Sequence, residues 1–347
     1  MKLGRERGIS TVAVVIIVIV IVVGAVVLVA YTESLPKVTL IVYSADAYVA
    51  EANSLESGFT GATGIHMAPP KGAGSTDLAQ QIASGDPDDV FISVSKSAAG
   101  PEVLKNQSEG WAVAFAADQM VIAYTNGSAS TAGGSQVVSD FRATSQGTNQ
   151  SWAKFFSDLT SGGVKVGISD PNSDPAGFRG WIVLEAAGYT YDSGNQTAYS
   201  SSLLAHGANS TAASAADLVA PLQAGNIQFL FIYKSAAISD NLTYFALPSL
   251  INLGSSSNGA YYSKFTYTTS TGVEKGGPIL LLVTVPVESK NQLDSIEFVT
   301  YVVKNDASLS SFGLTILSPA KVFNDSAVPS QISQLVSGGY AVYGGSL

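Results

Sequence analysis

The chain has 347 residues, a formal net charge of −9 and no cysteine. The lack of cysteine excludes disulfides, thiol catalysis and cysteine-ligated metal sites, and the acidic balance argues against nucleic acid as a partner. Hydrophobic residues make up 46% of the chain and charged residues only 12%, which predicts an ordered, weakly charged globular protein.

The first 31 residues predict a membrane anchor. Basic residues near the start precede an uncharged run from Thr11 to Tyr31, which is long enough to cross a bilayer. The positive-inside rule keeps the basic end in the cytoplasm and places the rest of the chain on the extracellular side. Residues 7–10 also resemble an archaeal prepilin-type signal that is cleaved after Gly8, so an uncleaved anchor and a processed one are both open.

A linker over 32–37 precedes the first predicted βα unit. Val38 to Ser44 predicts a buried strand, and Ala47 to Phe59 predicts a helix. Further on, Ala73-Gly74-Ser75 leads into a second predicted helix over 76–84. Ser75 can offer a hydroxyl and an amide to an anion at the helix start, or it can serve as a simple N-cap.

The middle of the chain predicts a second lobe. A continuous strand over 112–124 is expected to cross between lobes, and a strand over 279–286 is expected to return. Residues 126–150, rich in Gly, Ser and Thr, predict a mobile surface loop with one short helix. Ile227 to Ala237 predicts one long strand.

A strand over 164–168 is followed by a turn and then by Asp174 and Pro175, which predict an N-cap and the first helical position. This helix is expected to run to about Ala187 and to stop at Gly188. A helix that begins just past the carboxyl end of a strand presents unpaired N–H groups to the crevice where open α/β sheets bind anions.

The segment from Asp170 to Arg179 resembles the DPNxDPCGYR signature of the archaeal molybdate/tungstate-binding proteins, which are substrate-binding components of ABC importers. Further resemblances follow in the same order between Val38 and Pro319. They imply an α/β, two-lobed periplasmic-binding-protein-like fold, in which two mixed-sheet lobes joined by a hinge follow the N-terminal transmembrane helix. Lobe 1 would comprise 38–123 and 282–347, and lobe 2 would comprise 124–281.

The resemblance also implies a set of ligand-binding residues, namely Asp46, Ala47, Ser75, Asp174, Pro175, Ala176 and Tyr233. Asp46 and Ala47 replace a Gly-Ser pair of the family, and Ile232 and Leu250 stand where relatives carry acidic residues that expand the coordination of the metal centre.

Asp174 is then the carboxylate left to ligate that metal directly. Alternatively, Asp174 could bind the anion through its backbone amide, or carry a protonated side chain.

The function implied is capture of a tetrahedral oxyanion, molybdate or tungstate first, for an ABC permease, without a cofactor and without enzymatic activity. No HExxH, Gly-x-Ser-x-Gly or GxxxxGK[ST] motif occurs in the sequence, which agrees with a binding protein. Sulfate or another oxyanion on the same fold is one alternative, because Ala47 and Ile232 change the ligand set. A prepilin-like anchored structural or adhesive surface protein is the other.

Overall fold

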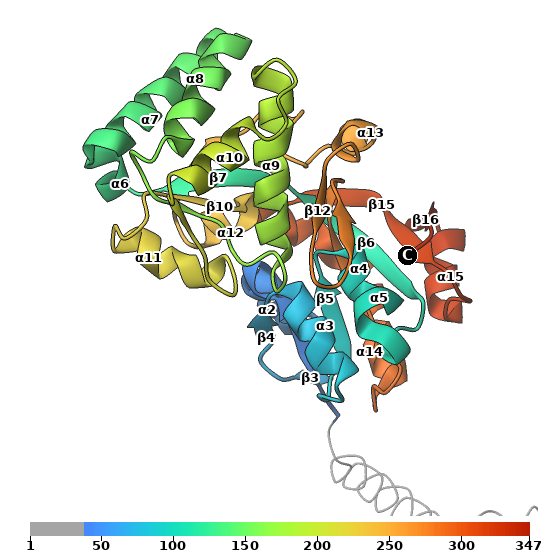
Figure 1. Ribbon diagram of the computed structural model, residues 1–347. Coiled ribbons are helices and arrows are strands. Elements are labelled where there is room, and N and C mark those ends of the chain that lie inside the picture. Colours follow the sequence, from blue (N-terminus) through green and yellow to red (C-terminus); the bar gives the residue numbers. More distant parts are fainter. Residues whose placement is uncertain (1–37) are drawn as a thin grey trace, which may run out of the picture. The chain divides into compact units, whose positions relative to one another are not determined.

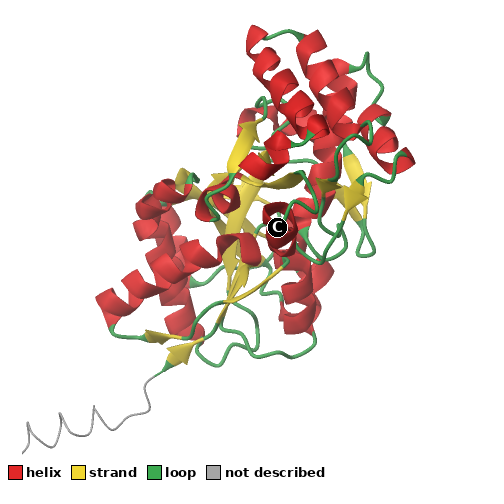
Figure 2. Ribbon diagram, turned by 90° about the vertical axis from the view of Figure 1, so that its left-hand side faces the viewer, coloured by secondary structure: helices red, strands yellow, loops and turns green. Residues whose placement is uncertain are grey.

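The computed structural model describes residues 38–347, of which Thr39–Leu347 form one compact unit. Two main sheets with helices packed on them make up this unit, and Figure 2 shows the strands between helices on both sides. No helix within residues 38–347 is both long enough and apolar enough to cross a membrane. The predicted anchor over Thr11–Tyr31 and the linker lie outside the described residues.

Lobe 1 is built on a seven-stranded mixed sheet (Figure 1). Its spatial order is β16 (Ala341–Gly345), β15 (Thr315–Asn324), β6 (Trp111–Asp118), β14 (Ile279–Thr284), β5 (Val90–Ser93), β2 (Val42–Ala45) and β4 (Lys71–Ala73). Strands β6 and β14 are buried along their whole length, as expected for apolar runs that are covered on both faces. The helices of this lobe are η1 (Asp46–Tyr48), α2 (Val49–Thr63), α3 (Ser75–Ala83), α4 (Lys96–Ala99), α5 (Pro101–Leu104), η2 (Lys105–Gln107), α14 (Gln292–Asn305), η6 (Asp306–Phe312) and α15 (Ser330–Ser337).

Lobe 2 is built on a five-stranded sheet in the order β11 (Thr243–Ala246), β7 (Met120–Tyr124), β10 (Phe229–Tyr233), β8 (Val166–Gly167) and β9 (Asn209–Ser210). The long helix α9 (Pro175–Tyr191) is apolar on nearly all sides and is therefore buried inside the structure. The other helices are α6 (Asn126–Ser130), α7 (Ala132–Ala143), η3 (Thr144–Gln146), α8 (Asn149–Thr160), α10 (Ala198–Ala205), η4 (Ala216–Leu218), α11 (Val219–Gln223), α12 (Lys234–Ser239), η5 (Ser256–Asn258) and α13 (Gly259–Tyr262). Two-strand ribbons complete the fold, β1 (Thr39–Leu40) with β3 (His66–Met67) and β12 (Thr266–Thr268) with β13 (Val273–Lys275).

The chain first crosses between the sheets at Gln119, not after residue 123, and it returns by Ile279, ahead of the predicted residue 282. Polar contacts split the predicted strand over 112–124 into β6 and β7. The Gln119 carbonyl accepts a hydrogen bond from Lys234 N at 2.9 Å, and its side-chain oxygen accepts one from Asn252 Nδ2 at 2.6 Å. The interlobe connection is thus fixed by hydrogen bonds from distant segments.

The prediction of a mobile loop over 126–150 is wrong, because helices α6 and α7 occupy most of it. The side chains of Thr125 and Thr131 cap the N-termini of these helices, and Val137 and Val138 bury one face of α7. Helix formation here depends on caps and tertiary packing, which the polar composition of the segment conceals.

Two predicted element ends also differ. Helix α9 continues through Gly188 to Tyr191, and a Cβ at Gly188 would lie 2.5 Å from Asn195 O, so this glycine permits close packing and does not end the helix. Strand β10 ends at Tyr233 and α12 follows from Lys234, so the observed strand ends four residues before the predicted end at Ala237.

Candidate functional site

The two lobes meet where α3 and α9 begin, and Figure 1 shows one end of α9 beside α2 and α3. The amide of Asp77 in α3 donates to Ser173 O, just before α9, at 3.4 Å. A Cβ added to Gly74 would lie 2.4 Å from the same carbonyl oxygen. Only a glycine permits this close approach between the two lobes.

Ser75 is completely buried at this contact, in the first turn of α3. The N-cap of the helix is Gly74, so the alternative that Ser75 is the N-cap is wrong. Its Oγ accepts a hydrogen bond from Val94 N at 3.2 Å, which leaves the hydroxyl proton to be donated elsewhere. The first amides of α3 also lack acceptors inside the helix. The Ser75 hydroxyl is therefore able to donate a hydrogen bond.

Asp174 is the N-cap of α9 with Pro175 in the first turn, which confirms the local prediction. Its Oδ1 accepts from Ala176 N at 3.0 Å and its Oδ2 from Ala215 N at 2.9 Å. Its own amide donates to Asp170 O at 2.9 Å. The amides of Asp174 and Ala176 are therefore already bonded, and Pro175 has no N–H, so the expectation of free amides at the start of α9 is wrong.

Tyr233 lies at the end of β10, 1% exposed, with its ring stacked on Tyr48 at 5.6 Å between centroids. Its hydroxyl oxygen accepts a hydrogen bond from Arg179 Nη1 at 2.7 Å, and Arg179 Nη2 donates to Val94 O at 2.6 Å. Burial raises the pKa of Tyr233 well above its ordinary value, so the phenol keeps its proton. Because the oxygen is the acceptor toward Arg179, that proton is left for another acceptor.

Asp46 and Ala47 of lobe 1 line a groove of about 350 Å³ between the lobes, and Ile232 and Ala215 of lobe 2 line it as well. Asp46 Oδ1 accepts from Ala47 N at 2.8 Å, and its Oδ2 is buried without a hydrogen-bond partner. Burial raises the pKa of Asp46, Asp217 adds to the shift, and the nearby Ser214 hydroxyl opposes it without reaching hydrogen-bonding geometry to Oδ2.

Asp174 and Asp46 also act on each other. Burial, and then the Asp46 carboxylate, raise the pKa of Asp174 to about 7. Of the three roles left open for Asp174, this shift favours a protonated side chain. Residues 38–347 contain no cluster of three or more His, Cys, Asp or Glu side chains suited to a metal ion.

The departures from the family signature lie on apolar surface. Ile232 is 1% exposed and faces the groove beside Asp46, whereas Leu250 is only half-buried and does not line it. No carboxylate replaces either residue there. The carboxylates that line the groove are those of Asp46 and Asp240.

Sequence reasoning missed Arg179 and Tyr48 as members of the site. Arg179 is 8% exposed and forms no ion pair among the described residues, and it is the one basic residue of a largely apolar helix. A single arginine in such a helix is a usable signal, because buried charges need partners. No comparable signal marks Tyr48, whose hydroxyl donates to Asp118 Oδ2 at 3.2 Å.

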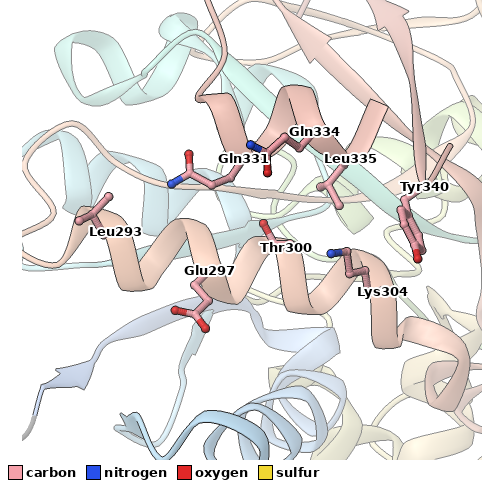
Figure 3. A pocket seen from close by; sticks show the side chains of 8 residues that line it. All are labelled: Leu293, Glu297, Thr300, Lys304, Gln331, Gln334, Leu335 and Tyr340. Carbon is pink, nitrogen blue, oxygen red and sulfur yellow. The ribbon is translucent and has the colours of Figure 1, made fainter. Parts of the chain in front are cut away.

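A separate cavity of about 420 Å³ lies between α14 and α15 (Figure 3). It is lined by the long side chains of these helices and by Tyr340, and Leu293 at its rim is 73% exposed. None of the predicted ligand-binding residues lines it. We therefore place the candidate site at the contact between α3 and α9.

Comparisons with known proteins agree with this architecture. The family described as bacterial extracellular solute-binding proteins matches residues 40–311. A solute-binding protein of Sulfurisphaera tokodaii is 37% identical to this chain over 316 residues, covering 88% of this chain and 83% of its own. One of Saccharolobus solfataricus is 33% identical, covering 88% and 78%.

Among solved structures, the periplasmic molybdate-binding protein of Azotobacter vinelandii matches with a TM-score of 0.57 and 17% identity, covering 80% of this chain and 99% of its own. This likeness shows the fold, and it confirms the predicted two-lobed periplasmic-binding-protein-like architecture. The matched family is one of solute-binding proteins and not of enzymes. On this evidence, the chain belongs to the bacterial extracellular solute-binding protein family.

Proposed function

We propose that this protein captures a tetrahedral oxyanion outside the cytoplasm and delivers it to the permease of an ABC importer, with molybdate or tungstate as the first candidates. The membership of a solute-binding family supports the transport role over a structural or adhesive one. The signature-like segment from Asp170 to Arg179 supports the choice of metal oxyanions.

The observation that carries the proposal is the buried Arg179–Tyr233 pair. Arg179 makes no ion pair with a carboxylate among residues 38–347; its hydrogen bonds go to Tyr233 and to the Val94 carbonyl, so its positive charge is not neutralised by a directly bonded group. It acts through Tyr233, whose proton is free to be donated, while Ser75 provides a second hydroxyl from the opposite lobe. Donors from both lobes then converge on one ligand, so that ligand binding stabilises the closed form.

Calorimetric titration of the protein with molybdate, tungstate and sulfate tests this proposal. Tyr233→Phe removes one donor, and we expect the Kd to rise about 3- to 10-fold, corresponding to about 0.5–1.5 kcal/mol for one hydrogen bond. The matched control is Tyr189→Phe, because Tyr189 is 43% exposed and lies outside the site. Binding of none of the three anions, or equal affinity of Tyr233→Phe and the wild type, would contradict the proposal.

Sulfate is a second candidate because of one specific observation, the apolar Ile232 in the groove. Because residues 232 and 250 are Ile and Leu, no carboxylate at these positions can ligate the metal centre of molybdate or tungstate. The site then has no metal ligand there that would favour these anions over sulfate. We expect Ile232→Glu to weaken sulfate binding by charge repulsion and to spare molybdate and tungstate relative to sulfate. Equal weakening of all three would show that the side chain does not discriminate between them.

We also propose that the run from Thr11 to Tyr31 holds the protein at the outer face of the membrane. Its length and lack of charge support this, as does the extracellular location in the family's description. Fractionation of cells that express the full chain or a form without residues 1–31 tests it. The full chain should sediment with membranes, and its release by high salt would argue against an inserted anchor.

A further inference from the structure

Two carboxylates reach the candidate site, and neither is ion-paired with a cation among residues 38–347. Asp46 comes from lobe 1 and Asp174 from lobe 2, and the ion pairs found within residues 38–347 are made by Lys71 and Lys154. The hydrogen bonds of Arg179 go to Tyr233 and to the Val94 carbonyl, and neither goes to a carboxylate. The single guanidinium of Arg179 would not offset both carboxylates in their ionised form together with a doubly charged oxyanion.

The surroundings of Asp46 increase this excess. The charged groups that interact with it are all acidic: Asp77 of α3, Asp174 before α9, Asp217 of η4 and Asp240 at the end of α12. On α2 and in the groove wall its neighbours include Asn53, Ala236 and Ser239, which carry no charge. A proton is therefore the charge that can be supplied without a rearrangement of the protein.

The geometry of Asp46 shows what such a proton would do. Its Oδ1 already accepts from Ala47 N, whereas the buried Oδ2 accepts no hydrogen bond. An ionised carboxylate is an acceptor only, but a protonated one carries an O–H donor. A proton on Oδ2 would cancel the local repulsion and would also turn an unpartnered acceptor into a donor toward the ligand.

We propose that Asp46 makes oxyanion capture proton-coupled. The closed, ligand-bound site holds one proton more than the free protein, and Asp46 donates it in a hydrogen bond to a ligand oxygen. The proton comes from solvent on closure and returns to solvent on release. This inference rests on the proposed oxyanion-binding function, and it assigns Asp46 as the residue that ties affinity to pH.

The mutual influence of the two carboxyls supports the inference. Burial raises the pKa of Asp46, and burial together with Asp46 raises the pKa of Asp174 to about 7. A bound anion beside them favours the protonated form of both carboxyls further, in the same direction as these shifts.

The test is calorimetric titration with sulfate and with molybdate between about pH 5 and 8, in pairs of buffers that differ in ionisation enthalpy. The dependence of the measured heat on the buffer gives the number of protons taken up. Sulfate does not titrate in this range, so any proton taken up with sulfate belongs to the protein. For the wild type we expect uptake approaching one proton per anion at the upper end of the range and a Kd that rises up to tenfold per pH unit there.

Two variants complete the design. Asp46→Asn should lower the proton uptake well below that of the wild type, weaken the pH dependence of the Kd and bind more tightly than the wild type at pH 8, with Asp174, whose pKa is about 7, keeping a smaller share of the uptake. Asp240→Asn is the matched control, because Asp240 is another acidic residue of the same groove, and it should keep the proton uptake. Thermal unfolding followed by circular dichroism checks that both variants are folded.

Anion binding by the wild type with no proton uptake, or uptake as large in Asp46→Asn as in the wild type, would overturn the inference and leave the oxyanion-binding function standing. Failure of the wild type and of Asp46→Asn to bind either anion at any pH would overturn both. The two failures are thus distinguishable in one set of titrations.

Discussion

Gly74→Ala should prevent full closure of the lobes while leaving each lobe folded. The added Cβ would lie 2.4 Å from Ser173 O and 3.1 Å from Asp174 Cα, whereas ordinary contacts begin at 3.4 Å. The lobes must therefore separate by about 1 Å at this point. The interlobe hydrogen bond from Asp77 N to Ser173 O, already 3.4 Å long, would then be lost.

The magnitude follows from what a ligand would lose. A separation of about 1 Å carries donors of one lobe beyond hydrogen-bonding distance from an anion that the other lobe holds. Loss of one or two such bonds to a charged group weakens binding by about 1.5–3 kcal/mol, which is roughly 10- to 100-fold in Kd. The free energy of unfolding in urea should change little, because hinge opening relieves the clash.

Titration with the oxyanion that binds the wild type best measures the affinity, and small-angle X-ray scattering measures the radius of gyration with and without the anion. Gly61→Ala is the matched control, because Gly61 lies in α2 and a Cβ there meets nothing within 4 Å. It should leave affinity unchanged and stabilise the helix by about 0.5–1 kcal/mol. Wild-type affinity and compaction on ligand binding in Gly74→Ala would refute the closure argument.

Three further predictions concern stability. A Cβ on Gly177 would lie 2.3 Å from Ser169 O within lobe 2, where no hinge can relieve it, so Gly177→Ala should lower the free energy of unfolding in urea by about 1–3 kcal/mol, and no loss would show that the turn yields. Burial raises the pKa of Glu51 to about 8 from 4.5, so the folded chain holds a proton that the unfolded chain releases, and stability should fall as pH rises from about 4.5 to about 8. Urea unfolding at several pH values measures this loss of stability, which should be about 1.4 kcal/mol for each unit by which the pKa is raised. Glu51→Gln should remove this part of the pH dependence, and an unchanged pH dependence would contradict the assignment. Ser235 Oγ donates to the buried Asp118 at 2.5 Å, and Ser235→Ala should cost about 1–3 kcal/mol, whereas wild-type stability would mean that water or another donor replaces the hydroxyl.

Local patterns predicted the parts of the fold that depend on neighbouring residues. Asp174 followed by Pro175 marks the start of α9 because capping and the fixed φ of proline act within one turn. The apolar runs of β6 and β14 likewise indicate strands that are buried on both faces. Within 126–150 only one short helix was predicted, whereas α6 and α7 fill 126–130 and 132–143, because their stability comes from threonine caps and packing and not from composition.

The candidate site could be predicted only in part, because its electrostatics depend on long-range contacts. Arg179 finds Tyr233 54 residues away in sequence and Val94 85 residues away. Likewise, Asp174 Oδ2 accepts a hydrogen bond from the amide of Ala215, 41 residues away in sequence. No spacing rule within a single element contains this information.

The order of the strands in lobe 1 has a consequence for biosynthesis. Strand β6 pairs with β14 on one side and β15 on the other, and both lie beyond all five strands of the lobe 2 sheet in the sequence. The chain is synthesised with its N-terminus first, so both edges of β6 stay unpaired until residues 279 onward have been made. The lobe 2 sheet, whose strands lie between Met120 and Ala246, can assemble earlier. Lobe 2 can therefore complete its sheet before lobe 1, although lobe 1 contains the first strands of the chain.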